Sequence, residues 1–234
     1  MPAILEERNL KFEFLHVEYL LFAQHEDCPP FDFEAERRTV HITLREIDWV
    51  CQQYQKPRYK ALRESDFPPS IEITPNINVN IIFTANPEYI GWGVGGSGTR
   101  GAKVFWLPYT AKWLPEETRA RLEKHRYVDE PGLVFDPINV LCHEAHHALG
   151  GHHSHKGPVA SSFLELVATW NAQVATFGKV LTPKQILEEL IPCAKEAPKR
   201  TRLALELLKN LGDYQDYKSY RWIIAWLDYH EKRR

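Results

Sequence analysis

The chain has 234 residues, of which 44% are hydrophobic and 26% are charged, a composition typical of a globular protein with a buried core. A formal net charge of −2 without a clustered basic segment argues against a nucleic-acid partner. No stretch of about 18 apolar residues and no secretory signal pattern occurs, so we expect a protein that does not enter a membrane. The four cysteines are widely spaced without a CxxC pair, which predicts reduced thiols in a cytoplasmic protein.

The N-terminal part gives mixed local patterns. Residues 10–25 are rich in aromatic side chains and fit either a strand or a helix, and we favour a helix in the second half. Arg38–Ile42 is typical of a short strand. The capping box that begins at Thr43 then predicts a helix to about Gln55.

A polar, proline-bearing connector at residues 56–70 is the domain boundary that we expect. It would separate an N-terminal lobe of unassigned role, residues 1–69, from a catalytic domain at residues 70–234. Just after it, Ile71–Ile73 and Asn78–Phe83 alternate between apolar and polar residues, which predicts half-buried strands.

Residues 91–101, GWGVGGSGTRG, form a glycine-rich stretch with a formal GxGxxG match. A dinucleotide-binding fingerprint should open a helix, whereas here a β-type segment follows, so we predict a glycine loop that joins strands. The segment that follows is Ala102–Leu107, which ends before Pro108. It could be an edge strand with free N–H and C=O groups or an ordinary interior strand.

Residues 136–150 predict a single helix. Asp136 is a favourable N-cap, Pro137 fits the first helical position, and Gly150 supplies a left-handed stop. Its apolar residues predict a largely buried helix, in which Cys142 serves as core packing.

This helix carries the HExxH pattern, residues 143–147. His143 and His147 are four residues apart, so their imidazoles lie on one helix face and can bind one Zn²⁺. Glu144 can then accept a proton from a metal-bound water. The alternative is a helix with solvated histidines, but buried histidines and a buried carboxylate need polar partners.

With this motif the chain resembles the zincin metallopeptidases. The resemblance implies an α+β fold in which a small mixed or antiparallel sheet with a glycine-rich loop is followed by the active-site helix and a helical C-terminal half. In zincins an edge strand ahead of the active-site helix often pairs with the substrate backbone, and Ala102–Leu107 is the candidate for that strand.

The resemblance leaves two candidates for the third zinc ligand. In gluzincins it is a Glu on the next helix, and Glu165 lies 18 residues beyond His147 on the predicted next helix. In metzincins the pattern continues as HExxHxxGxxH, which His153 matches, but that branch also has a Met-containing turn and the only methionine here is Met1. We therefore favour Glu165 and keep His153 as the alternative. The face of the helix that carries Glu165 is formed by small residues: Ser161, Ala168, Ala172 and Ala175.

The catalytic domain thus divides into a sheet part at residues 70–135, the metal-site helices at residues 136–180 and further helices at residues 181–234, one of them at Pro198–Leu211.

The sequence predicts a zinc metalloendopeptidase with Glu144 as general base and a narrow choice of protein or peptide substrate. Two alternatives stay open: a non-catalytic protein with structural zinc, and a metal-dependent hydrolase of non-peptide amides.

Overall fold

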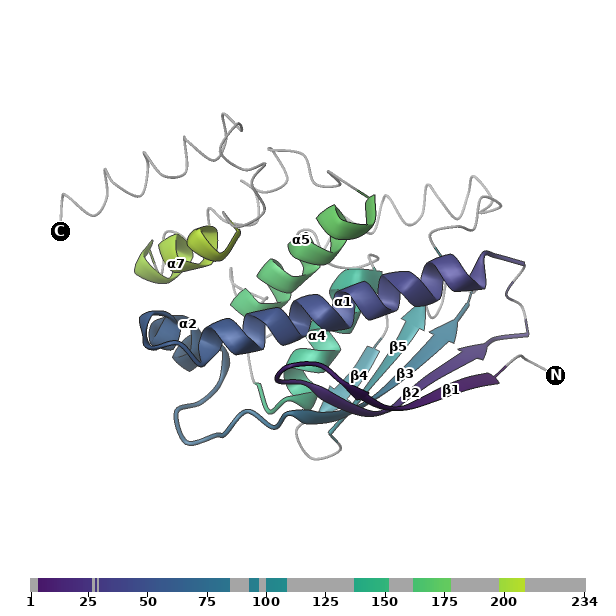
Figure 1. The fold of residues 1–234 in the computed structure, drawn as a ribbon, viewed down its shortest axis with the longest axis horizontal. Coiled ribbons are helices and arrows are strands. Elements are labelled where there is room, and N and C mark those ends of the chain that lie inside the picture. Colours follow the sequence, from purple (N-terminus) through teal and green to yellow (C-terminus); the bar gives the residue numbers. More distant parts are fainter. Residues whose placement is uncertain are drawn as a thin grey trace.

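The structure is a computed structural model that describes residues 4–26, 28, 30–84, 93–96, 100–108, 137–151, 162–177 and 198–208. These residues form an α+β fold, as predicted, in which a mixed sheet carries helices on one face (Figure 1). Among the described helices, none is long and apolar enough to cross a membrane.

The sheet has five strands in the order β1-β2-β3-β5-β4. They are β1 (Ile4–Lys11), β2 (His16–Gln24), β3 (Asn76–Phe83), β4 (Gly93–Gly96) and β5 (Gly101–Trp106). Strands β2, β3 and β5 run parallel, while β1 and β4 are antiparallel to their neighbours. The two antiparallel strands are therefore the edges of the described sheet.

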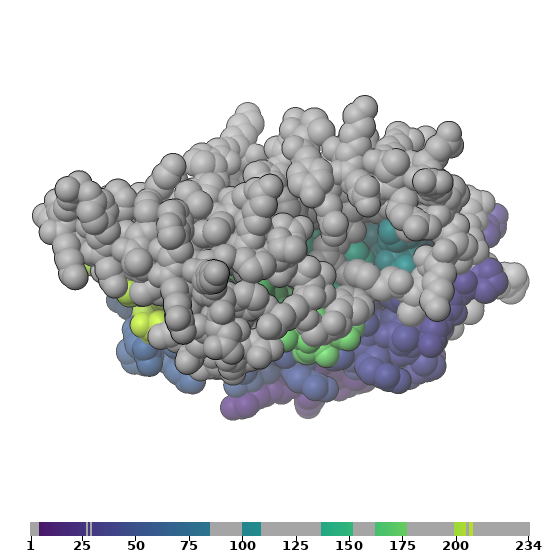
Figure 2. Space-filling model, turned by 90° about the horizontal axis from the view of Figure 1, so that it is seen from above, coloured from purple at the N-terminus to yellow at the C-terminus, as the bar shows by residue number. Residues whose placement is uncertain are grey.

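The described helices and the short 3₁₀ turn η1 are α1 (Phe33–Tyr54), η1 (Pro57–Tyr59), α2 (Lys60–Asp66), α4 (Pro137–Ala148), α5 (Phe163–Phe177) and α7 (Pro198–Leu208). Helix α4 packs on β4 and β5, and α5 packs across α4 and α1. Figure 2 looks onto this helical layer, where surfaces of α1, α5 and α7 are visible. The HExxH helix therefore lies between the sheet and a second helix.

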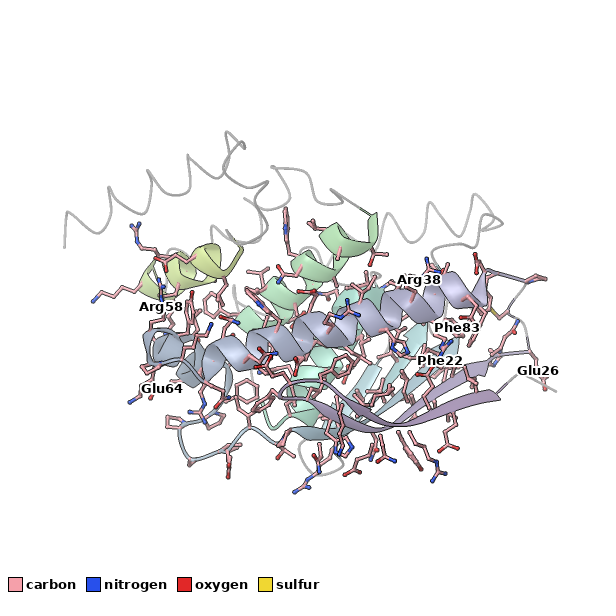
Figure 3. All side chains as sticks on the ribbon, in the orientation of Figure 1. Phe22, Glu26, Arg38, Arg58, Glu64 and Phe83 are labelled. Carbon is pink, nitrogen blue, oxygen red and sulfur yellow. The ribbon has the colours of Figure 1, made fainter. Side chains whose placement is uncertain are left out.

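The core lies between the sheet and the helices. In β3 the buried residues Ile77, Val79, Ile81 and Phe83 alternate with half-buried ones, as its sequence pattern predicts. Phe22 and Phe83 extend from neighbouring strands toward α1 with stacked rings 6.1 Å apart (Figure 3). Burial of these apolar faces supplies the main stabilising free energy of the fold.

The helix favoured for the second half of residues 10–25 is wrong, because that segment is β2. Val17, Leu20 and Phe22 lie in the core, but Leu21 and Ala23 on the other face are only half-buried. Apolar residues on both faces hide the period of two that would have indicated a strand.

The strand predicted at Arg38–Ile42 is also wrong, since these residues lie within α1. The β-branched residues favour a strand locally, but tertiary burial at helical spacing through Val40, Leu44 and Ile47 overrides that preference. The Thr39 hydroxyl donates to the carbonyl of Ala35 one turn earlier, so its polar atom is satisfied within the helix.

The predicted connector at residues 56–70 contains η1 and α2. Residues on both sides of the expected boundary contribute to one sheet, because β2 pairs with β3, and to one hydrophobic core. The candidate edge strand Ala102–Leu107 corresponds mainly to β5, which is interior because β4 pairs on its far side. In the described sheet, the free edge beside the HExxH helix belongs to β4.

Candidate metal centre

Helix α4 ends as its sequence predicts. Gly150 has a φ of +101°, the left-handed conformation that favours glycine, and the N–H groups of Gly150 and Gly151 donate to the carbonyls of His147 and His146 to close the last turn. Cys142 is completely buried, which confirms its packing role. The predicted N-cap Asp136 lies outside the described residues.

His143 and His147 lie side by side on α4. Their ring centroids are 4.8 Å apart and the rings are inclined by 78°. Two imidazoles that bind one zinc ion through Zn–N bonds of about 2.0–2.1 Å in tetrahedral geometry have centroids about 5 Å apart. The spacing of the two rings therefore fits a shared metal ion.

Each of these rings has its Nδ1 beside an oxygen atom. Nδ1 of His143 is 3.0 Å from Oε2 of Glu165, and Nδ1 of His147 is 3.3 Å from the carbonyl oxygen of Gly151. A carbonyl oxygen can only accept, so the second contact places a proton on Nδ1 of His147 and leaves Nε2 with the lone pair that a metal needs. Such oxygen partners fix the orientation of metal-binding histidines.

Glu165 lies in the first turn of α5 and is 0% exposed. Its Oε2 faces His143, while its Oε1 has no hydrogen-bond partner in the described part of the chain. A buried carboxylate with an unpartnered oxygen is costly unless a cation or a proton is nearby. The predicted packing of α5 is confirmed, since Val167 on one face and Ala168 on the other are both fully buried.

The described residues do not by themselves complete a metal site. Among them, no three His, Cys, Asp or Glu side chains form a group that could enclose an ion. The structure brings His143 next to both His147 and Glu165. Of the three predicted ligands, His143 and His147 are the two whose spacing fits one shared ion. The alternative ligand His153 lies outside the described residues.

Glu144 is 7% exposed, next to this histidine pair. Burial raises the pKa of its carboxyl group, nearby His143 lowers it, and Glu165 raises it. A raised pKa makes the carboxylate a stronger base near neutral pH, as a general base requires.

The third histidine of the motif, His146, has a structural role. Its ring is fully buried against Phe67, with centroids 5.0 Å apart, and its Nε2 lies 2.9 Å from the main-chain oxygen of Asp66. This ring also lies beside the His147 ring, with centroids 5.5 Å apart, and its contact with Asp66 ties α4 to the end of α2. The sequence does not predict this contact of Asp66, because a single acidic residue in an expected connector matches no motif.

Helices α4 and α5 also meet through a second polar pair. The Asn139 side-chain amide donates to the Thr169 hydroxyl over 3.2 Å, and both residues are buried. Asn139 precedes His143 by one helical turn, and Thr169 follows Glu165 by one turn. The two helices are thus held in register by successive polar pairs along one seam.

Comparisons with known proteins do not assign the chain to a family. A scan of family models, a search of curated proteins and a search of solved structures each found no match. The function must therefore be inferred from the chemistry of the site.

Proposed function

We propose that this protein is a zinc-dependent metallopeptidase of zincin-like architecture. The observation that carries the proposal is the convergence of the His143 and His147 rings beside the buried Glu165 carboxylate with its unpartnered oxygen. His143 and His147 would hold the zinc, with Glu165 as the favoured third ligand and His153 as the alternative. We retain a cytoplasmic location as part of the proposal. It rests on the wide spacing of the four cysteines, which form no CxxC pair.

The chemistry divides between the metal and the protein. When bound, zinc supplies a water of lowered pKa and polarises the scissile carbonyl. Glu144 would serve as general base, taking up a proton on its carboxylate and passing it to the leaving amine. Its buried position excludes bulk water, which would otherwise compete for that proton. The contact between Nδ1 of His147 and the Gly151 carbonyl keeps that ring in place while the proton moves.

The sheet offers a place for an extended substrate. Strand β4 is an antiparallel edge of the described sheet and packs against α4. An edge strand can pair with a peptide backbone through its free N–H and C=O groups. We therefore propose β4 in place of Ala102–Leu107 as the strand that binds a protein or peptide substrate beside the HExxH helix.

Zinc binding and peptidase activity of four purified proteins test the proposal. The full chain should bind one zinc ion and cleave members of a mixed peptide library. His143→Ala should lose both properties, whereas Glu144→Gln should keep zinc and lose turnover by about a thousandfold or more. His41→Ala is a matched control, because this α1 histidine pairs with Glu7 on β1, outside the candidate site, and its replacement should change neither property.

Two results would contradict the proposal. Normal cleavage by Glu144→Gln would exclude the mechanism, and a full chain that binds no zinc would exclude the site. Inhibition by a hydroxamate separates an open catalytic site from a closed structural one. Turnover of simple amides without peptide cleavage would favour the hydrolase of non-peptide amides, which the same residues can serve.

A further inference from the structure

Asp66, at the end of α2, binds the start of α5 through its side chain. Its Oδ1 accepts a hydrogen bond from the N–H of Phe163 over 3.0 Å, and its Oδ2 accepts one from the N–H of Leu164 over 2.7 Å. The Tyr54 hydroxyl on α1 donates to Oδ2 over 2.7 Å. The residue is 2% exposed. Three elements therefore meet at one buried carboxylate.

The same residue also binds α4, through its main chain. Its carbonyl oxygen lies 2.9 Å from Nε2 of His146, the residue that precedes His147. The His146 ring is completely buried and lies against the backbone of Gly151, where a Cβ would be only 2.1 Å from its Nε2. Asp66 thus connects the helix of the histidine pair to the helix of Glu165, with one polar contact to α4 and two to α5.

We propose that Asp66 is a positioning residue for the metal site, which sets the start of α5, and with it Glu165, against His143. Glu165 directly follows Leu164, so a shift of the α5 N-terminus moves its carboxylate relative to the His143 ring. Metal sites need their donors held to within about 0.5 Å. This inference rests on the proposed zinc site and names the residue that organises it.

Helix capping alone does not explain Asp66. Helix α5 already has a local cap, because the Ser162 hydroxyl accepts the N–H of Glu165 over 3.0 Å. Asp66 comes from a segment 97 residues away from Phe163 and is removed from water at a cost in free energy. A remote carboxylate adds what a local cap cannot, namely a fixed position of α5 relative to α2 and α4.

Asp48 provides a matched control. It is also a buried aspartate on a helix, and its carboxylate likewise accepts two backbone N–H groups, those of Phe14 and Leu15. These contacts tie α1 to the turn between β1 and β2 and do not involve α4 or α5. Asp48→Ala should therefore lower stability as Asp66→Ala does, without an effect on the metal site.

The test measures zinc affinity of the full chain by competition with a chromophoric chelator, together with thermal unfolding. Asp66→Ala should weaken zinc binding by about 10-fold to 100-fold, as expected for outer-shell partners, while Asp48→Ala leaves it unchanged. Tyr54→Phe, which removes one hydrogen bond to Asp66 without opening a large cavity, should weaken zinc binding by a smaller factor and serves if Asp66→Ala does not fold. Unchanged zinc affinity in folded Asp66→Ala, or in Tyr54→Phe if that variant must serve, would overturn the inference.

A second measurement needs no metal. In the metal-free protein, ¹⁵N spectra of the imidazoles report the contact between Nδ1 of His143 and Glu165. Asp66→Asn should shift this signal and Asp48→Asn should not; an unshifted signal would overturn the positioning role. If the full chain binds no zinc but the signal shifts, the proposed function fails while the positioning of Glu165 against His143 stands.

Discussion

Replacement of Gly151 by alanine should destabilise the protein through a single side chain. A Cβ at this position would lie 2.1, 2.3 and 2.5 Å from three atoms of the His146 ring, far inside van der Waals contact. The ring cannot move away, because it is fully buried, packs on Phe67 and is bound to the Asp66 carbonyl. Gly151→Ala must therefore break that hydrogen bond or displace the end of α4.

The magnitude follows from two costs. A buried carbonyl that loses its partner costs about 1–3 kcal/mol. Overpacking of a dense core costs about a further 1–3 kcal/mol. We expect Gly151→Ala to lower the free energy of unfolding by about 2–6 kcal/mol, measured by urea denaturation at neutral pH.

A double-mutant cycle identifies the cause. His146→Ala removes the ring and should destabilise the protein on its own, but it also makes room for the new methyl group. The double variant should then be more stable than the sum of the single effects predicts, by at least about 1 kcal/mol. Additive effects, or a Gly151→Ala protein within about 0.5 kcal/mol of the parent, would refute this account of the contact.

Three further predictions concern buried carboxylates. Asp48→Ala should lower the free energy of unfolding by about 2–4 kcal/mol in urea denaturation, because the N–H groups of Phe14 and Leu15 lose their acceptor; a loss below about 0.5 kcal/mol would contradict this. Burial raises the pKa of Asp66 from 3.8 to about 6, so the folded state holds this proton more tightly than the unfolded state does. The bound proton therefore adds about 3 kcal/mol to the free energy of unfolding below about pH 4. This stabilisation is lost as the pH rises through 6. Asp66→Asn should remove it, and parallel stability profiles of the two proteins between pH 4 and 7 would exclude the effect. Glu165→Gln should lower zinc affinity by at least about tenfold in chelator competition, and unchanged affinity would exclude Glu165 as a ligand or orienting group.

Some parts of the fold could be predicted because their information is local. The Gly150 stop, the alternation in β3 and the two buried faces of α5 each follow from residues close in sequence. The same local patterns failed for β2 and for the start of α1. In both segments the residues that decide between helix and strand contact distant parts of the chain, which local propensity does not report.

The candidate site shows the same division. The spacing of His143 and His147 predicts their approach, and the apposition of Glu165 to His143 agrees with the choice of the next helix. The role of Asp66 could not be predicted, since its partners His146 and Leu164 lie 80 and 98 residues away. Nothing in the segment around Asp66 indicates that two helices will meet there.

A zinc-edge anomalous difference map from crystals of the zinc-loaded protein tests the central claim most directly. The account predicts one peak at about 2.0–2.1 Å from a nitrogen of both His143 and His147, with one more protein ligand and an open fourth position. A map without a peak at these two rings, or with four protein ligands around the ion, would contradict it.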